Sequence, residues 1–160
     1  MYIGVIGQGQ CDDETYSIAE EVGRLIAKEG AVLVCGGLGG VMEGAAKGAR
    51  SAGGMTLGIL PGFSRAEANP YISISIPTGF GVARNILVVR SSDVLIAISG
   101  GHGTLTEISF ALHFAKPVIG LYTWGLTRNG KAVEDIIPVK TPEEAVGKAM
   151  EFIKKSNRSE

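Results

Sequence analysis

The sequence has few of the residues that build disulfide frameworks, metal sites or strongly charged surfaces. It has two cysteines, Cys11 and Cys35, whose spacing fits neither a disulfide scaffold nor a zinc site. Its 15 lysines and arginines nearly balance its 16 aspartates and glutamates, so the net charge is −1. Such a chain has no strong field to attract nucleic acid or anionic lipid. We expect free thiols, no metal centre, no nucleic-acid partner and a small-molecule ligand.

Long hydrophobic runs are also missing from the sequence. No run reaches the roughly 18 apolar residues that a membrane span needs. The opening segment, residues 1–6, has no basic region followed by a cleavable apolar stretch. We expect a complete cytoplasmic protein that makes no membrane contact. Its 160 residues fit one domain, residues 1–160.

Short apolar runs alternate with segments of helical periodicity along the whole chain. Each run is short and continuous, as in strands that are buried on both faces of a parallel sheet. Strands are expected at residues 2–6, 31–35, 55–60, 71–76, 93–98, 117–122 and 136–139, with helices after most of them. The sequence therefore predicts the α/β class, a Rossmann-like, doubly wound and mainly parallel sheet with helices on both faces.

Glycine is the residue in excess, with 24 in the chain, about twice the usual share of roughly 7%. Gly40, Gly44 and Gly48 fall at intervals of four in an expected helix, and Ala52 continues the series. Each glycine costs a helix about 1 kcal/mol relative to alanine, so a close approach to another backbone or a ligand must offset that cost. This small-residue face predicts a homo-oligomer, a homodimer or homotetramer, although such faces also pack within one chain.

Three glycine-rich loops follow three of the expected strands. Right-handed crossovers place all such loops at one edge of the sheet, where α/β proteins bind ligands. Glycine there lets backbone N–H groups approach an anion, although in a single loop it serves a tight turn at least as well. The predicted phosphate or ligand residues are Gly7, Gly9, Gly36, Gly37, Gly39, Gly40, Met42, Ser99, Gly100, Gly101, His102, Gly103 and Thr104.

Standard nucleotide motifs are absent from these loops. Asp12 occupies the position of the third glycine in the dinucleotide fingerprint, and no loop ends in the Gly-Lys-Ser/Thr of a P-loop. Ordinary NAD and ATP binding are therefore disfavoured.

Two segments carry a family resemblance. The segment from Gly36 to Gly44 resembles the GGGxxGLMG motif of the LOG (Lonely Guy) proteins, and the segment from Gly100 to Glu107 resembles their PGGxGTxxE motif. The similarity covers most of residues 3–122. LOG proteins are typically homodimers that hydrolyse the N-glycosidic bond of cytokinin nucleoside 5′-monophosphates, with no required cofactor.

The resemblance implies a catalytic pair, Glu107 and Arg84, with Gly101, Gly103 and Thr104 holding the phosphate. A carboxylate can stabilise the positive charge that develops on a ribosyl group, and an arginine can bind phosphate in a bidentate manner. Glu107 also ends a capping-box pattern that begins at Thr104, which is the alternative reading of this residue.

Four positions depart from the LOG pattern. Ser99 replaces a proline, His102 a tyrosine, Asn85 a lysine and Thr106 a glutamate. The serine ahead of the glycines is closer to a LOG-like branch that includes molybdenum cofactor carrier proteins. Two hypotheses follow: a phosphoribohydrolase of nucleoside 5′-monophosphates, and a non-catalytic carrier or sensor of a phosphorylated ligand such as the pterin of the molybdenum cofactor.

Overall fold

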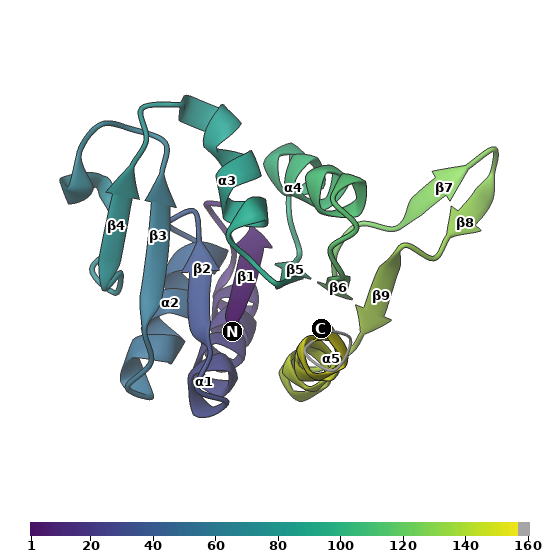
Figure 1. The fold of residues 1–160 in the computed structure, drawn as a ribbon, viewed down its shortest axis with the longest axis horizontal. Coiled ribbons are helices and arrows are strands. Elements are labelled where there is room, and N and C mark those ends of the chain that lie inside the picture. Colours follow the sequence, from purple (N-terminus) through teal and green to yellow (C-terminus); the bar gives the residue numbers. More distant parts are fainter. Residues whose placement is uncertain (157–160) are drawn as a thin grey trace.

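The computed structural model describes residues 1–156, which form a seven-stranded sheet with helices on both faces (Figure 1). All neighbouring strands in this sheet are parallel, in the order β4-β3-β2-β1-β5-β6-β9. The strands are β1 (Tyr2–Gly7), β2 (Val32–Cys35), β3 (Thr56–Leu60), β4 (Ile74–Pro77), β5 (Val94–Ile98), β6 (Val118–Leu121) and β9 (Ile136–Val139). The predicted Rossmann-like fold is confirmed.

The helices form two layers, each with its own apolar core. On one face lie α1 (Asp13–Lys28), α2 (Val41–Ser51) and α5 (Pro142–Ser156), packed on one side of the central strands. On the other face lie α3 (Asn85–Arg90), which continues the 3-10 turn η2 (Gly81–Arg84), and α4 (His102–His113). A second 3-10 turn, η1 (Arg65–Glu67), precedes β4. No helix in residues 1–156 is long and apolar enough to cross a membrane.

Helix ends follow the chemistry of their first residues. Asp12 caps α1, because its side chain accepts the N–H of Thr15 at 2.8 Å. Thr141 caps α5 by accepting the N–H of Glu144 at 3.2 Å, and Pro142 occupies the first helical position.

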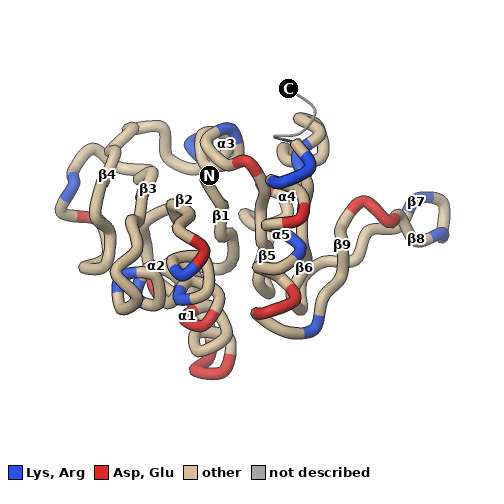
Figure 2. Tube along the Cα trace, turned by 60° about the horizontal axis from the view of Figure 1, so that its bottom comes forward, with Lys and Arg blue, Asp and Glu red and all other residues tan. Residues whose placement is uncertain are grey.

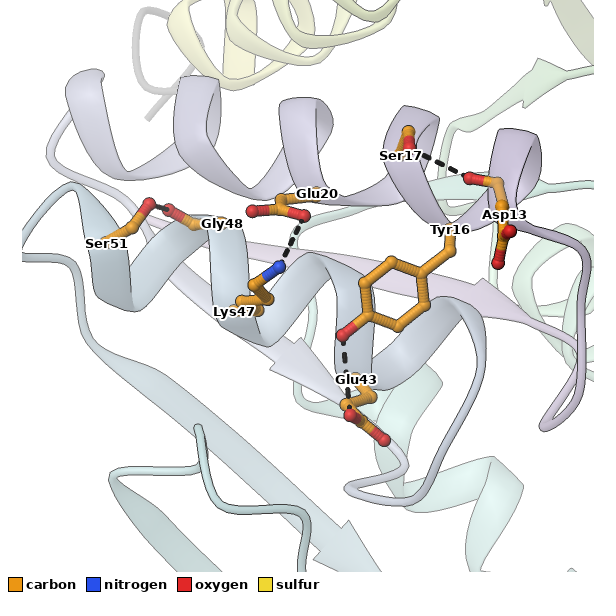
Figure 3. Close-up of polar contacts among 8 residues, drawn as sticks. All are labelled: Asp13, Tyr16, Ser17, Glu20, Glu43, Lys47, Gly48 and Ser51. Carbon is orange, nitrogen blue, oxygen red and sulfur yellow. Dashed lines mark hydrogen bonds and ion pairs between the residues drawn. The ribbon is translucent and has the colours of Figure 1, made fainter.

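The small-residue face of α2 packs against α1 within the same chain. A Cβ added to Gly48 would lie 1.8 Å from the carbonyl oxygen of Glu20, and one added to Gly44 would lie 2.8 Å from that of Tyr16. Figure 3 shows the polar contacts that flank this approach, with Lys47 paired to Glu20 at 3.0 Å. The face is therefore filled inside the chain, so the oligomer prediction loses that argument. The oligomeric state itself stays a prediction.

The structure also contains an unpredicted hairpin between β6 and β9. Strands β7 (Leu126–Arg128) and β8 (Lys131–Val133) pair antiparallel and stand away from the sheet (Figure 1). The Asn129-Gly130 turn joins them, with φ of 53° and 74°, and this dipeptide is the sequence signal for such a hairpin.

Candidate functional site

A cavity of about 350 Å³ opens where the sheet order reverses, at the carboxyl ends of the central strands. The chain winds outward from β1 to β4 and then returns to β5 on the other side of β1, and such switch points are the usual ligand sites of α/β sheets. Its polar or glycine lining comes from four segments: Gly7, Gln8 and Gly9; Gly36; Arg84 and Asn85; Gly101, Gly103, Thr104 and Glu107.

The N-terminus of α4 lies at this cavity. The helix begins at His102, and its N-cap Gly101 offers no side chain to the free N–H groups of the first turn. A Cβ at Gly101 would meet no atom within 4 Å, and one at Gly103 would meet only the Asn85 amide at 4.0 Å. The first turn is therefore open to a ligand, and the positive end of the helix favours an anion there.

Arg84 is a buried cation in the cavity wall, only 7% exposed. Its Nη2 donates to the carbonyl oxygen of Gly36 at 3.2 Å, and its Nη1 donates to the Oδ1 of Asn85. Burial lowers the pKa of Arg84, and the nearby Glu107 acts in the opposite direction. These bonds hold the guanidinium in one orientation beside the cavity.

Glu107 lies one turn into α4 and is 6% exposed. Burial raises the pKa of its carboxyl to about 8, and the positive charge of Arg84 offsets only part of that rise. No hydrogen bond or direct ion pair to the Glu107 side chain occurs within residues 1–156. Burial therefore favours the protonated form of this carboxyl.

Two buried polar atoms at this cavity have no hydrogen-bond partner within the described residues, the hydroxyl of Thr104 and the Nε of Arg84. Buried polar groups in folded proteins nearly always have partners, so each such atom needs an explanation. Both residues line the same cavity, but the two atoms themselves are buried in its wall, so a ligand reaches them only if these side chains turn toward it.

Hydrogen bonds brace the three glycine-rich loops against each other and against the chain after β6. The N–H of Val41 donates to the carbonyl oxygen of Gln8 at 3.1 Å, and the Gln8 amide donates to the Ser99 hydroxyl at 3.5 Å. The Thr123 hydroxyl donates to the carbonyl oxygen of Ser99, and the Trp124 indole donates to that of Gly101 at 3.2 Å.

The predicted ligand residues divide into two groups in space. Those that line the cavity are Gly7, Gly9, Gly36, Met42, Gly101, Gly103 and Thr104, together with the predicted pair Arg84 and Glu107. The others, Gly37, Gly39, Gly40, Ser99, Gly100 and His102, shape the loops without lining it. Gly40 shows why: a Cβ there would lie 2.4 Å from the carbonyl oxygen of Gln8, so its glycine allows two loops to touch.

Two interpretations of the third loop are wrong. Thr104 and Glu107 do not form a capping box, because the helix starts at His102 and Gly101 is its N-cap. His102 is not in a loop but is the first helical residue, with its ring 6.1 Å from that of Trp124. The three glycines before Thr104 concealed the true start of the helix, because glycine is a poor helix former.

Gln8, Asn85, Pro61 and Val82 also line the cavity and were not predicted as site residues. Asn85 was noted only as a departure from the LOG pattern. The sequence feature that could have identified Asn85 as a site residue is its position next to Arg84, because its side chain accepts a hydrogen bond from that guanidinium.

A Rossmann-type sheet with an arginine, a carboxyl group and a helix N-terminus at its switch point defines a class of small-molecule sites. The SLOG cluster4 family model matches residues 1–146, and this chain belongs to that family. The predicted relationship to LOG-like proteins, including molybdenum cofactor carriers, is confirmed.

Two curated relatives are similar in sequence. An uncharacterized protein of Archaeoglobus fulgidus is 49% identical over 146 residues, which cover 91% of this chain and 92% of that protein. The cytokinin riboside 5′-monophosphate phosphoribohydrolase of Mycobacterium tuberculosis is 34% identical over 122 residues, 70% of this chain and 65% of that enzyme.

Two solved structures match nearly the whole chain. The molybdenum cofactor binding protein of Rippkaea orientalis has a TM-score of 0.85 and 37% identity, with 95% of this chain and 96% of that chain covered. The molybdenum cofactor carrier protein of Chlamydomonas reinhardtii has a TM-score of 0.83 and 33% identity, with 96% and 98% covered.

Proposed function

We propose that this protein binds a phosphorylated pterin of the molybdenum cofactor type and carries it without chemical change. The observation that carries the proposal is the convergence of Arg84, the open first turn of α4 and the unpartnered Thr104 hydroxyl on one cavity. A phosphate at the N-terminus of α4 would accept hydrogen bonds from all three sources.

The rest of the cavity suits a flat heterocycle. Its walls include the side chains of Leu38, Met42, Pro61 and Val82, which are apolar. The volume of about 350 Å³ falls in the range of small-molecule pockets. A ligand with an anionic phosphate at one end and a ring system at the other therefore matches the polarity of the site.

The protonation state of Glu107 favours the carrier over the hydrolase. Stabilising a ribosyl cation requires an ionised carboxylate, whereas burial raises the pKa of this carboxyl and favours its neutral form. A neutral carboxyl can instead donate a hydrogen bond to a carbonyl or ring nitrogen of a bound heterocycle.

The hydrolase remains a second candidate because Arg84 and Glu107 share the cavity, as the LOG resemblance requires. In that case the phosphate would occupy the same end of the site, and ligand binding would have to ionise Glu107. The 34% identity to the M. tuberculosis phosphoribohydrolase supports this alternative.

One experiment separates the two functions. The purified protein is mixed anaerobically with molybdenum cofactor released from a molybdoenzyme, and the retained pterin and molybdenum are quantified. In parallel, the protein is incubated with purine and cytokinin nucleoside 5′-monophosphates, and free base is measured by chromatography. We expect about one pterin per chain and no base.

Arg84→Ala is the control variant, and it should retain at least about tenfold less pterin, because it removes a charge-assisted contact to the anion. Multiple turnovers of free base that disappear in Glu107→Gln would establish the hydrolase and overturn the carrier. Failure to retain pterin, with no base released, would reject both functions.

A further inference from the structure

The chain that follows β6 makes two hydrogen bonds to the turn that precedes α4. The Thr123 hydroxyl donates to the carbonyl oxygen of Ser99. The Trp124 indole N–H donates to the carbonyl oxygen of Gly101 at 3.2 Å. Strands β5 and β6 are neighbours in the sheet, so the segments that follow them leave the sheet side by side. Two consecutive side chains thus hold the turn that leads into the N-terminus of α4.

The turn that they hold has an uncommon backbone conformation. Ser99 has a φ of 50°, in the left-handed region that a residue with a side chain seldom adopts, and Gly100 has a φ of 117°. Such conformations persist where the surrounding structure fixes them. The N–H of Ser99 donates to the carbonyl oxygen of Leu121 at 3.1 Å, and its hydroxyl accepts from the Gln8 amide at 3.5 Å. With the bond from Thr123, every polar group of Ser99 has a partner.

The bond from Trp124 orients a whole peptide unit. A peptide unit is planar and trans, so the carbonyl oxygen of one residue and the N–H of the next point in opposite directions. Fixing the Gly101 carbonyl therefore fixes the N–H of His102, which belongs to the first turn of α4 and has no acceptor within residues 1–156. The same carbonyl accepts the N–H of Leu105 at 3.1 Å, so the indole takes its second lone pair. Each bond to the carbonyl also polarises the unit and strengthens its N–H as a donor.

Orientation matters at this helix start because charged side chains are scarce around it. Residues 94–106 and 117–127 contain no lysine, arginine, aspartate or glutamate. Figure 2 shows the chain from β6 to the start of β7 in tan, without a blue or red residue. An anion at the start of α4 is therefore attracted by peptide dipoles, whose effect depends on the direction in which they point.

We infer that Trp124 is a positioning residue for anion binding, whose indole N–H sets the direction of the first free N–H groups of α4. The inference rests on the proposed function only in placing a phosphate at the start of α4, whatever group carries that phosphate. Trp124 does not line the ligand cavity, and it acts through Gly101, which does. A residue with a packing role alone would support the fold and leave affinity for phosphate unchanged.

The test compares phosphorylated probes with the same molecules after a phosphatase has removed the phosphate. The probes are adenosine 5′-monophosphate and the oxidised pterin phosphate prepared from molybdenum cofactor, and calorimetric titration gives their dissociation constants. Trp124→Phe keeps an aromatic ring but removes the donor. It should raise the dissociation constants of the phosphorylated probes about three- to tenfold, the effect of one hydrogen bond. The dephosphorylated probes should bind as they bind to the wild type.

Thr123→Val tests the same turn without changing Trp124. Valine has nearly the shape of threonine and lacks the hydroxyl that donates to the Ser99 carbonyl. This variant should show the same selective loss of affinity for the phosphorylated probes. It keeps the inference testable even where Trp124→Phe folds poorly.

Trp124 is the only tryptophan in the chain, so its fluorescence reports on this bond in the unmodified protein. An anion at the first turn of α4 polarises the peptide unit to which the indole donates. Adenosine 5′-monophosphate and inorganic phosphate should therefore change the indole emission of the wild type, whereas adenosine should not. A packing role would leave the emission unchanged with all three probes.

Leu126→Ala is the matched control. Leu126 packs against the same apolar core as Trp124, on the face of the sheet that carries α3 and α4, but it makes no hydrogen bond to the turn. The control should lower the free energy of unfolding and leave affinity for the phosphorylated probes unchanged.

The outcomes distinguish this inference from the proposed function. A wild type that binds adenosine 5′-monophosphate but not the pterin phosphate, with the loss in Trp124→Phe, rejects the proposed cargo and supports the inference. Pterin phosphate binding that is the same in Trp124→Phe and Thr123→Val as in the wild type overturns the inference and leaves the proposed function standing. Equal losses for phosphorylated and dephosphorylated probes also overturn the inference, as does a wild type that binds no phosphorylated probe.

Discussion

Arg84 donates a hydrogen bond from Nη2 to the carbonyl oxygen of Gly36, 3.2 Å away and 48 residues earlier in the chain. The bond fastens the start of α3 to the loop after β2, and both segments line the ligand cavity. It requires glycine at position 36, because a Cβ there would lie 2.4 Å from Nη2 and 2.7 Å from the sulfur of Met42. The orientation of the buried cation thus depends on a residue that has no side chain.

Gly36→Ala should therefore weaken ligand binding without removing any charged group. The added methyl displaces the Arg84 guanidinium from the cavity wall, and we expect at least about a tenfold loss of molybdenum cofactor affinity, the effect of losing one charge-assisted hydrogen bond. The amount of pterin that stays bound to the protein through gel filtration measures this loss of affinity. Gly125→Ala is the matched control, because a Cβ there meets nothing within 4 Å. Unchanged pterin retention in Gly36→Ala would disprove this dependence.

Thr104→Val should separate ligand binding from stability. Valine has nearly the shape of threonine, and the buried Thr104 hydroxyl has no partner within residues 1–156, so the free energy of unfolding should stay the same or rise. If the hydroxyl donates to a ligand phosphate, affinity for that ligand should fall by about tenfold. Urea unfolding of the empty protein and pterin retention give the two values. A large loss of stability would mean that the hydroxyl has a structural partner.

The raised pKa of Glu107 predicts that stability decreases as pH rises. The carboxyl has an ordinary pKa of 4.5 in the unfolded chain and about 8 in the fold. Between these values the folded state holds a proton that the unfolded state has released, so each unit of pH costs up to about 1.4 kcal/mol. The stabilisation that comes from protonated Glu107 is fully present below pH 4.5. It decreases as pH rises and is lost above pH 8.

Glu107→Gln should remove this dependence, because glutamine stays neutral. Urea unfolding between about pH 5 and 8 should show that the free energy of unfolding falls less steeply with pH in the variant. The stability of the variant relative to the wild type should therefore increase as pH rises. The thiol of Cys35 and the phenol of Tyr16, both with pKa raised to about 12, do not titrate in that window in the fold. Parallel slopes for the two proteins would mean that Glu107 is ionised in the fold.

Gly48→Ala should destabilise the protein even though alanine is the better helix former. The added Cβ would lie 1.8 Å from the carbonyl oxygen of Glu20, so α1 and α2 must separate. Overpacking of this kind costs about 1–3 kcal/mol or more, which exceeds the helix propensity gain of about 1 kcal/mol. The control is Gly147→Ala on the exposed side of α5, which meets nothing within 4 Å and should stabilise. If thermal unfolding shows a higher melting temperature for both variants, the close packing of α1 and α2 at Gly48 is contradicted.

The sequence predicted the parts of the fold that local chemistry determines. Apolar runs located the strands of the parallel sheet, because strands covered by helices on both faces are apolar along their whole length. The β7–β8 hairpin was missed because its strands have three residues each and bury little, so they lack an apolar pattern. Only the Asn129-Gly130 dipeptide indicated it.

The resemblance to LOG proteins, not local spacing, singled out Arg84 and Glu107, and the structure puts both in the lining of one cavity. Their roles there stay a prediction. The neutral state of Glu107 depends on the three-dimensional burial of its carboxyl, which sequence spacing does not contain. For the same reason, the glycines of α2 did not reveal that α1 is the neighbour they approach.

The hydrogen bonds from Val41 to Gln8 and from Gln8 to Ser99 have a thermodynamic consequence for recognition. Because hydrogen bonds within the chain hold these loops together, a ligand contributes little to ordering them, and little conformational entropy is lost on binding. The same rigidity limits adaptation: a ligand one ring substituent too large meets walls that cannot yield without breaking these bonds. Selectivity in such a site arises from exclusion by shape, and the phosphate contributes affinity common to all competitors.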